Sequence, residues 1–463
     1  MTQKMKIWLV FLIFLNGFVS MGLELLIMRQ LSFFVGSAAV ITSIIMGCFM
    51  GFMSLGYFLG TRGNFDVART RKMLCAGFLT ISVMAVIAAS FPIMSDFFGI
   101  MYGVGIKSGV VQTFIFALIF LSVGPFLFGF NTTLLSRMLH KYNTNYAGNI
   151  MAWDTIGSVV ASIATTLLFM PFVGVNNTVI LIVVLAVGAA FIVTPRVRIG
   201  VAAICICAAA AVINSNGLQE RRFGILVNNA NSTISVMNGG DDVRVLYMNG
   251  LPMSVYYPGY NMGAEYINYI NDNFIYNMPR DKKRKILVLG AGGFTAGLND
   301  DFNDYTFVDI EPTLKDISEQ KFLNKKLTPN KKFIVRDASQ YLKNTPEKYD
   351  LILLDVYSNS YQIPENLITI EFMNRIKSRV ADDGVIIMNM VTSASFRDAY
   401  TRVFDNTFHH VFPHNTQRQV IGPANPWMTD DEISNVMYIY YNRKNDGRIY
   451  TINKTPVIYD RYK

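Results

Sequence analysis

The sequence is short of charge and of cysteine, and each shortage excludes a class of protein. Charged residues make up only 16% of the 463 positions, while 52% are hydrophobic and the mean hydropathy is +0.32. These values exclude an ordinary water-soluble protein. The cysteines are too few for a disulfide-rich scaffold, and we expect neither a disulfide framework nor a cysteine metal site. All four lie in apolar segments: Cys48, Cys75, Cys205 and Cys207.

Histidine is equally scarce, with four residues in the whole chain. Three of them fall close together, at His409, His410 and His414, and such a group can bind a metal. Adjacent histidines tend to point apart, however, and Pro413 would interrupt a helix. A surface or core position is therefore the favoured interpretation, and we predict no metal site.

The abundant residues are apolar, and most of them lie in the first 213 positions. We predict a transmembrane helical domain over residues 1–213, embedded in the lipid bilayer, with six or seven helices. The seventh segment is short and rich in alanine, so its crossing stays open. Gly47 with Gly51, and Gly56 with Gly60, predict close helix packing. The apolar segments are 7–28, 34–60, 73–94, 109–136, 148–172, 177–194 and 199–213.

The net charge of +9 does not indicate nucleic-acid binding, because no basic cluster is interleaved with aromatic residues. Basic residues instead alternate between the loops, which places the N-terminus in the cytoplasm of a protein of the cell (inner) membrane. Seven crossings would leave the C-terminal domain outside, whereas six would leave it in the cytoplasm. The predicted cytoplasmic cations are Lys4, Lys6, Arg62, Arg69, Arg71, Lys72, Arg137, Lys141, Arg196 and Arg198.

A few ionisable residues lie within or beside the apolar segments. Glu24 and Arg29 are near the end of the first, and Asp154 lies in the fifth, beside Trp153. Charges at membrane depth are usually paired or functional. A structural ion pair or an interfacial position is the favoured interpretation, and a substrate or ion path is the alternative.

From about residue 222 the pattern changes to short strands. Thr233–Met237, Val243–Met248 and Pro252–Tyr257 are predicted strands, and Asn249 with Gly250 is a hairpin signal. A helix is predicted from Glu265 to Asn273. We therefore expect a small β-hairpin lobe with a linking helix over residues 222–280.

Residues 281–463 carry the stretch that indicates function. The apolar strand 286–289 runs into Gly290, Gly292 and Gly293, and a second strand, 305–308, is followed by Asp309 and Glu311. A buried strand, a glycine turn and a helix form a nucleotide-binding crevice, with the later acid accepting from ribose hydroxyls. The pattern predicts a nucleoside site, and a plain turn between a strand and a helix is the alternative.

Strands and helices then alternate, which predicts a parallel, doubly wound, Rossmann-like sheet. Asp309, Asp337 and Asp355 each follow a predicted strand. Ligands bind at the carboxyl ends of such strands. One aspartate could simply cap the next helix, but three on one edge favour a ligand site.

Residues 232–395 resemble the spermidine synthases, which are aminopropyltransferases with a methyltransferase-like Rossmann fold and an N-terminal β-hairpin lobe. On this resemblance Gly290 to Gly293 is the glycine-rich turn and Asp309 the ribose-binding acid. Asp337, followed by Ala338, falls on the adenine-contacting position, and Asp355 on the catalytic-loop aspartate. The resemblance implies S-adenosylmethionine or its decarboxylated form as cofactor.

The N-terminal half also resembles a family, at Gly22, Glu24, Arg29 and the stretch 149–157. The whole chain therefore resembles the membrane-fused spermidine-synthase-like proteins.

The chain departs from the family at positions that would hold the amines. Gly293 and Ser358 stand where the family has aspartates, Met253 where it has glutamine, and Ala264 where it has histidine. An amine nucleophile needs a carboxylate to deprotonate and orient it.

We therefore hypothesise a membrane-anchored transferase that acts on a non-standard acceptor. The alternative is a non-catalytic nucleoside-binding sensor, transporter or assembly protein. Catalytic turnover, a homo-oligomeric state and a membrane partner are all left open by the sequence.

Overall fold

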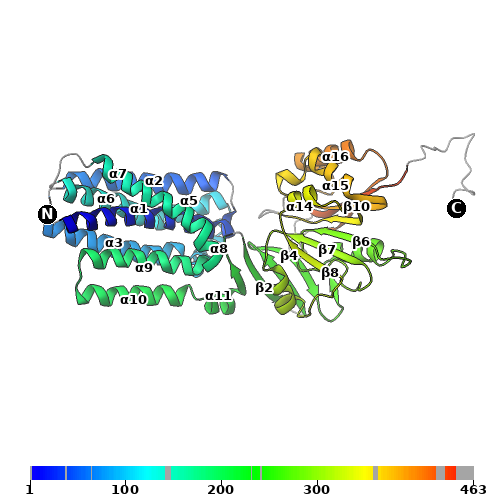
Figure 1. Ribbon diagram of the computed structural model, residues 1–463, viewed down its shortest axis with the longest axis horizontal. Coiled ribbons are helices and arrows are strands. Elements are labelled where there is room, and N and C mark those ends of the chain that lie inside the picture. Colours follow the sequence, from blue (N-terminus) through cyan, green and yellow to red (C-terminus); the bar gives the residue numbers. More distant parts are fainter. Residues whose placement is uncertain are drawn as a thin grey trace, which may run out of the picture. The chain divides into compact units, whose positions relative to one another are not determined.

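The computed structural model describes residues 3–36, 39–63, 65–140, 147–230, 232–239, 242–357, 363–423 and 433–444. The chain divides into two compact units (Figure 1). The first comprises Met1–Gly239 with Arg244–Met253, and the second comprises Gly240–Val243 with Ser254–Lys463.

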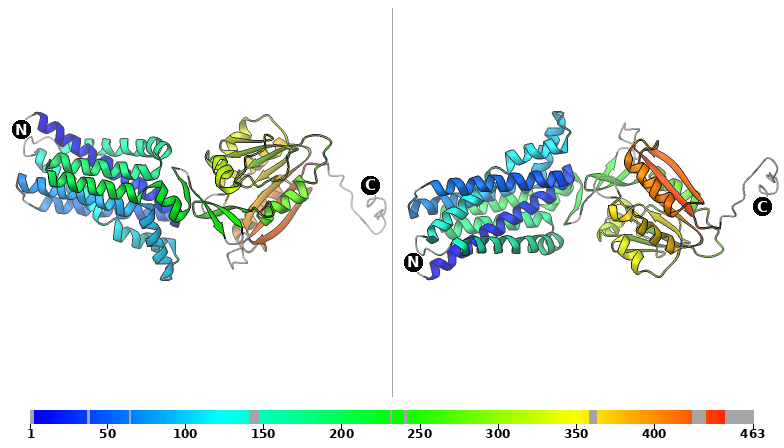
Figure 2. Two further views of the ribbon diagram at one scale, coloured as in Figure 1. Left: turned by 90° about the horizontal axis from the view of Figure 1, so that it is seen from below. Right: turned by 90° about the horizontal axis from the view of Figure 1, so that it is seen from above.

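The first unit is a bundle of apolar helices, and each of the seven predicted segments coincides with a helix or a run of helices. Among the described residues, six helices are long and apolar enough to cross a membrane, or up to seven if α5 and α6, bent by 45°, form one span. Both views in Figure 2 show the long helices side by side. The helices are α1 (Gln3–Val35), α2 (Ala39–Arg62), α3 (Val67–Ala89), α4 (Phe91–Gly103), α5 (Gly109–Phe120), α6 (Val123–His140), α7 (Ala147–Ala164), the π-helical turn η1 (Thr165–Phe169), α8 (Met170–Val173), α9 (Val175–Val193), α10 (Val197–Ile213) and α11 (Asn216–Phe223).

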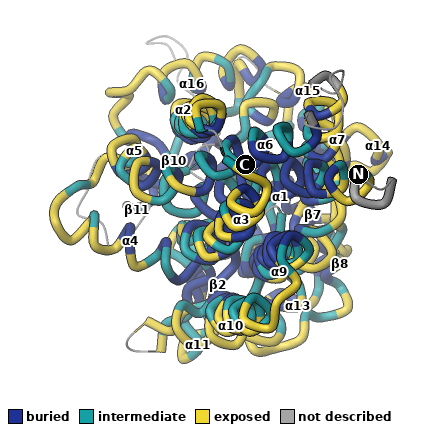
Figure 3. Tube along the Cα trace, turned by 90° about the vertical axis from the view of Figure 1, so that its left-hand side faces the viewer, coloured by how far each residue is buried: buried dark blue, intermediate teal, exposed yellow. Residues whose placement is uncertain are grey.

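Helix α1 lies inside this bundle, and α10 lies on its outside. Val19, Leu26 and Leu31 of α1 have no exposed surface, while Ala210 is the one residue of α10 that is buried (Figure 3). In water, exposure of this apolar helix would cost free energy, whereas in a lipid bilayer the same surface would contact apolar acyl chains.

Glycines allow some of these helices to approach closely. A Cβ on Gly56 would lie 2.0 Å from the Phe126 carbonyl oxygen of α6, and one on Gly60 would lie 2.8 Å from Thr133. This confirms packing for the second glycine pair. Gly47 and Gly51 have nothing within 4 Å of an added Cβ, so for them the packing prediction is wrong within this chain.

Basic residues gather at one end of the bundle. Arg71 at the start of α3 donates to the Val193 carbonyl at the end of α9, over 2.8 Å. Arg137 near the end of α6 donates to the carbonyls of Thr61 and Gly63 at the end of α2. The ends of four helices therefore meet there, as the alternation of basic loops predicts.

The chain leaves the bundle at the opposite end. Arg29, near the end of α1, donates to the Asn229 carbonyl over 2.8 Å and to Thr233 Oγ1 over 3.1 Å. Strands β1 (Ile225–Asn228) and β2 (Thr233–Gly239) therefore pack at that end. They open a five-stranded sheet of order β1-β2-β3-β4-β5, with β3 (Val243–Met248), β4 (Leu251–Tyr257) and β5 (Met262–Gly263). The predicted turn between β3 and β4 forms with positive φ at both Asn249 and Gly250.

The second unit is built on a seven-stranded sheet of order β11-β12-β10-β9-β6-β7-β8. Strands β8, β7, β6, β9 and β10 are parallel, as predicted. Strand β12 runs antiparallel between β10 and β11, so the sheet is mixed and the prediction of a wholly parallel sheet is corrected. The strands are β6 (Lys285–Leu289), β7 (Asp304–Asp309), β8 (Lys331–Val335), β9 (Tyr349–Leu354), β10 (Val380–Thr392), β11 (Thr416–Pro423) and β12 (Ser434–Tyr441).

Amphipathic helices cover one face of this sheet (Figure 1). Phe372 of α15, Phe404 and Phe408 of α16, and Leu342 of α14 join the strand residue Leu354 in one buried core. The remaining helical elements are α12 (Glu265–Ile270), η2 (Asn271–Ile275), α13 (Leu314–Ile317), η3 (Ser318–Phe322), α14 (Ala338–Asn344), η4 (Glu365–Leu367), α15 (Ile370–Arg379) and α16 (Ala399–Val411).

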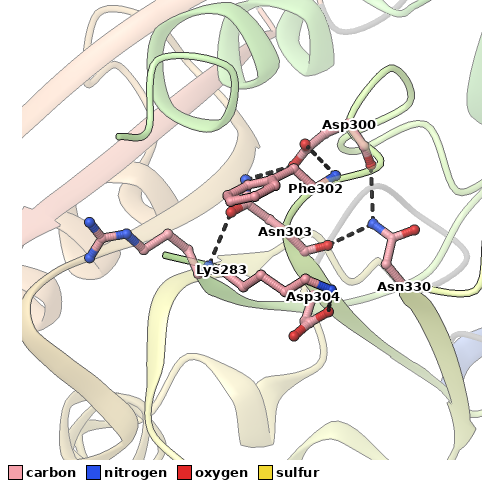
Figure 4. A network of polar contacts seen from close by, with 7 residues as sticks. Lys283, Asp300, Phe302, Asn303, Asp304 and Asn330 are labelled. Atoms are coloured by element: carbon pink, nitrogen blue, oxygen red, sulfur yellow. Dashed lines mark hydrogen bonds and ion pairs between the residues drawn. The ribbon is translucent and has the colours of Figure 1, made fainter. Parts of the chain in front are cut away.

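A polar network holds the amino ends of β6 and β7 (Figure 4). Asp300 accepts from Asn303 over 2.7 Å and from the Tyr305 hydroxyl over 2.6 Å, and Asn330 donates to the Asn303 carbonyl. Burial alone would raise the pKa of Asp300, but these hydrogen bonds outweigh it and lower the pKa. This network is structural, because it lies at the opposite ends of the strands from the candidate site.

Candidate functional site

The predicted site residues gather at the carboxyl edge of the parallel strands. Leu289 pairs with Val308 on one side and with Leu354 on the other, so Gly290, Asp309 and Asp355 each follow a paired residue. Neighbouring strands lie about 4.8 Å apart, which places the two aspartates on either side of Gly290, roughly 10 Å from each other.

The turn after β6 depends on glycine. Gly290 has φ +92°, and its N–H donates to the Val308 carbonyl over 2.9 Å. A Cβ there would lie 2.1 Å from the Asp355 carbonyl oxygen, so no larger residue fits. Gly292 also has a positive φ, of +48°.

No helix follows this turn among residues 290–303, all of which the structure describes; they form turns and bends instead. The sequence prediction of a strand–turn–helix unit is therefore wrong in its last part. Asn299, Asp300, Asn303 and Asp304 favour turns over helix interior, which accounts for the difference. The glycine turn is not followed by the helix N-terminus that often faces a phosphate, which suits a nucleoside without phosphates better than a nucleotide.

Side chains from neighbouring segments hold the glycine turn in place. The Gly293 N–H donates to Ser254 Oγ over 2.9 Å, and its carbonyl accepts from Ser318 over 2.8 Å. The Gly297 N–H donates to Asn271 over 2.7 Å. Between Gly290 and Leu298, only Gly290 and Gly292 keep partial exposure. These two glycines therefore form the surface that a ligand can approach.

Asp309 joins the glycine turn to the end of β7. One of its carboxylate oxygens accepts from the Ala291 N–H over 2.9 Å, and the other accepts from the Glu311 N–H over 3.0 Å. Burial raises the pKa of Asp309, although these backbone hydrogen bonds partly oppose it. Glu311 is 1% exposed and accepts from the Thr313 hydroxyl over 2.6 Å. It lies behind Asp309.

Asp337 and Ala338 lie beyond the end of β8. The Asp337 side chain accepts from the Gln340 N–H over 2.9 Å and caps α14, whose first residue is the buried Ala338. The capping alternative therefore applies to Asp337. A carboxylate has lone pairs to spare, so capping leaves it able to accept from a ligand.

Asp355 follows β9 and is held by two neutral donors. Tyr266 donates its hydroxyl to one carboxylate oxygen over 2.9 Å, and Asn389 donates its amide to the other over 2.9 Å. Burial raises the pKa of Asp355, and these two hydrogen bonds partly oppose the rise. The pKa of Tyr266 is raised well above its ordinary value by burial and by Asp355, so the phenol stays protonated.

Sequence reasoning missed Tyr266 and Asn389. Tyr266 reads as an apolar-face residue of its helix. Asn389 is 1% exposed and interrupts the apolar run of β10. A polar residue in such a run indicates a buried polar contact, and this is the feature of the sequence from which Asn389 could have been found. Ser358, which departs from the family pattern, lies outside the described residues. The three histidines are exposed, and the described ranges contain no cluster of three metal-ligating side chains.

Residues 272–424 match the family model of the spermine/spermidine synthase domain. The polyamine aminopropyltransferase of Vibrio vulnificus is 28% identical over 152 residues, covering 31% of this chain and 50% of that protein. The chain thus spans about half the length of this relative, and 52% of a similar one from Sulfurisphaera tokodaii.

A longer match extends beyond the second unit. Polyamine aminopropyltransferase 2 of Aquifex aeolicus is 22% identical over 399 residues, covering 81% of this chain and 77% of that protein. A solved structure of a probable spermidine synthase from Corynebacterium glutamicum is 23% identical, covers 48% of this chain and 80% of that one, and has a TM-score of 0.38. By the family-model match, residues 272–424 are similar to the spermine/spermidine synthase domain.

Proposed function

We propose that the second unit is a transferase that uses S-adenosylmethionine or its decarboxylated form and acts on a non-standard acceptor. The observation that carries this proposal is Asp355. It is a partly buried carboxylate beside the partly exposed glycine turn, and its oxygens are oriented by Tyr266 and Asn389. The match to the spermine/spermidine synthase family supports the same reaction class.

The residues present fit the nucleoside part of such a cofactor. Gly290 and Gly292 are the exposed positions of the turn, Asp309 is fixed beside them, and Asp337 lies one strand further along. In this arrangement Asp309 would accept from the ribose and Asp337 from the base. The cofactor supplies the electrophilic carbon, which is attached to a positively charged sulfur.

Asp355 would orient the acceptor and take its proton. With the cofactor bound there, its sulfur would be the leaving group, taking the electron pair of the carbon–sulfur bond as the acceptor bonded to the carbon, and Asp355 would receive the acceptor's proton. A raised pKa suits this task, because the carboxylate then binds the proton more readily.

The acceptor differs from an ordinary polyamine on this proposal. A Cβ on Gly293 would lie 2.1 Å from the Phe322 ring, so that ring closes the space where the family has an aspartate. Asp355 already accepts two neutral hydrogen bonds. One carboxylate of this kind suits a neutral or singly charged nucleophile better than a polyamine with several charges.

A turnover assay tests the proposal. The full chain in detergent micelles is incubated with each cofactor and with panels of amines, alcohols and thiols. We expect an acceptor-dependent release of 5′-methylthioadenosine or S-adenosylhomocysteine, detected by mass spectrometry. Release that no acceptor increases, with either cofactor, would contradict the transferase.

We further propose that the helical unit anchors the protein in the cell membrane with its basic end in the cytoplasm. If α5 and α6 form one span, the described residues provide seven candidate spans: α1, α2, α3, α5 with α6, α7 with α8, α9 and α10. An odd number of passes leaves β1 on the non-cytoplasmic side, which agrees with the Arg29–Asn229 contact at the non-basic end.

A reporter fused after Lys463 tests this topology. We expect alkaline phosphatase, which is active only outside the cytoplasm, to be active there, and a cytoplasmic fluorescent reporter to be dark. The same reporters placed after Arg62, at the basic end, should give the reverse result. A phosphatase that is inactive at Lys463 would show that one of the seven passes does not cross.

The second candidate function is a non-catalytic nucleoside-binding sensor, transporter or assembly protein, which a second unit outside the cytoplasm would favour. Adenosylated cofactors are made in the cytoplasm, so an external domain would have to receive its ligand by export. Nucleoside binding without turnover distinguishes this candidate from the transferase.

A further inference from the structure

The helical unit contains a buried polar cluster that the transferase does not use. Asn16 of α1 donates to Thr132 Oγ1 of α6 over 2.9 Å and to the Phe128 carbonyl over 3.3 Å. Asp154 of α7 interacts with the Asn16 side chain and with Tyr57 of α2. Four helices therefore contribute to one polar centre in the bundle.

Helices α1 and α7 are held together beside this cluster. A Cβ on Gly17 would lie 2.1 Å from the Asp154 carbonyl oxygen, and one on Gly157 would lie 2.1 Å from the Phe14 carbonyl oxygen. These reciprocal contacts set the two backbones at the closest approach that glycine permits. The cluster is consequently rigid, because its side chains extend from fixed backbones.

The oxygens of the cluster are not satisfied by the protein. Within the described residues, Oδ1 of Asn16 and Oδ1 of Asp154 are buried without a hydrogen-bond partner, and Asn16 is 1% exposed. A buried acceptor without a partner costs free energy, so these two oxygens are candidate ligand contacts, as are Glu24 Oε1 and Asn131 Oδ1 in the same bundle. Both unpaired atoms accept hydrogen bonds, so they call for a donor, and the carboxylate calls for a positive charge.

A pocket of about 520 Å³, which Asn16 and Asp154 do not line, lies about one helical turn from them along α1 and α7. Its walls include Ile13 of α1, Leu139 of α6, and Ile150 with Trp153 of α7. Ile13 precedes Asn16 by three residues, Ile150 precedes Asp154 by four, and Leu139 follows Thr132 by seven. Each pair shares a helix face, so all three helices continue from the pocket wall to the polar cluster.

The combination selects an organic cation. Aliphatic walls suit an alkyl chain, and the face of Trp153 attracts positive charge. A bare metal ion is less suited, since the described ranges hold no cluster of three acidic, histidine or cysteine ligands. Lys6 also lines the pocket. It lies ten residues from Asn16 along α1, about 15 Å, so it lies farther from the cluster than Ile13 does.

We propose that Asp154 and Asn16 bind the ammonium group of an organic amine whose alkyl chain occupies this pocket. The site is separate from the candidate transferase site and does not depend on that activity. A charged residue within an apolar segment often marks a substrate path, and this site would be part of such a path.

Tryptophan fluorescence of the full chain in detergent micelles tests the site. The probe is 1,4-diaminobutane, and 1,4-butanediol is its uncharged analogue of equal length. We expect a saturable change with the diamine and none with the diol. The change should be lost in Trp153→Phe, which places it at the pocket. Asp154→Asn should weaken the diamine response at least ten-fold, while the matched control Asp96→Asn, an exposed acid paired with Arg222, should retain it.

Asn16→Leu provides a second route if Asp154→Asn fails to fold, since it removes the unpaired amide oxygen and leaves the charge. It too should weaken the response. The proposal is overturned if the wild-type protein gives no saturable response to the diamine, if the diol acts equally, or if a folded Asp154→Asn or Asn16→Leu protein responds with unchanged affinity.

Discussion

Replacing Asp309 by alanine is expected to weaken adenosyl-ligand binding roughly 10- to 100-fold, the loss of about 1.5–3 kcal/mol that a charged hydrogen bond contributes. The carboxylate has two tasks. It would accept from the ribose, and it already accepts from the N–H groups of Ala291 and Glu311. Its removal therefore also loosens the glycine turn. Titration calorimetry of the full chain with 5′-methylthioadenosine measures the loss.

A matched pair of helix-capping aspartates separates ligand binding from stability. Asp337 caps α14 and Asp398 caps α16, where it accepts from the Thr401 N–H over 2.7 Å. Either change to alanine should cost about 1 kcal/mol of stability, the usual contribution of a cap. Only Asp337→Ala should also weaken ligand binding. Full affinity in both Asp309→Ala and Asp337→Ala would remove the nucleoside site from these residues.

Replacing Asp355 by asparagine is expected to reduce turnover 10²- to 10⁴-fold, the usual range for loss of a positioned general base, while ligand binding persists. Asparagine has the same shape. Its oxygen can accept from Asn389, and its amide can donate to the Tyr266 oxygen. The control is Asp350→Asn at the amino end of the same strand, where the carboxylate accepts from the Lys285 N–H, and turnover should be unchanged. Turnover that survives Asp355→Asn would exclude the assigned role.

The same variant has a pH-dependent effect on stability. Burial raises the pKa of Asp355, so the native state binds this proton more tightly than the unfolded chain, whose aspartates titrate near about pH 3.9. Wild-type stability therefore falls as pH rises from that value through the raised native pKa. Asp355→Asn has no carboxyl group at this position, so its stability does not fall with rising pH for this reason. Its thermal midpoint should exceed the wild-type midpoint by more at pH 8 than at pH 5, and an equal gap would contradict the buried, raised carboxylate.

Hydrophobic patterning predicted the helices well, because a run of about 20 apolar residues has few other stable states. It also placed the parallel strands β6, β7 and β9, whose apolar runs end at turn residues. The antiparallel strand β12 could be located but not oriented. Its direction is set by the path of the chain through β11, which alternation alone does not specify.

The candidate site was predictable where backbone geometry demands a particular residue. Gly290 had to be glycine, since φ is +92° and the Asp355 carbonyl lies against it. Tyr266 and Asn389 were not predictable, because they reach Asp355 from distant parts of the chain. The missing helix after Gly290 depends on a balance among several turn-forming residues, which a glycine motif does not report.

The most direct test of the central claim is calorimetric titration of the full-length wild-type chain in detergent micelles. The ligands are S-adenosylmethionine, its decarboxylated form and 5′-methylthioadenosine, with adenosine 5′-monophosphate as the phosphate-bearing comparison. We predict one saturable site for an adenosyl thioether or sulfonium ligand, and weaker binding of the monophosphate. A folded protein that binds none of the three adenosyl ligands would contradict the assignment of Gly290, Asp309 and Asp337 as a nucleoside site.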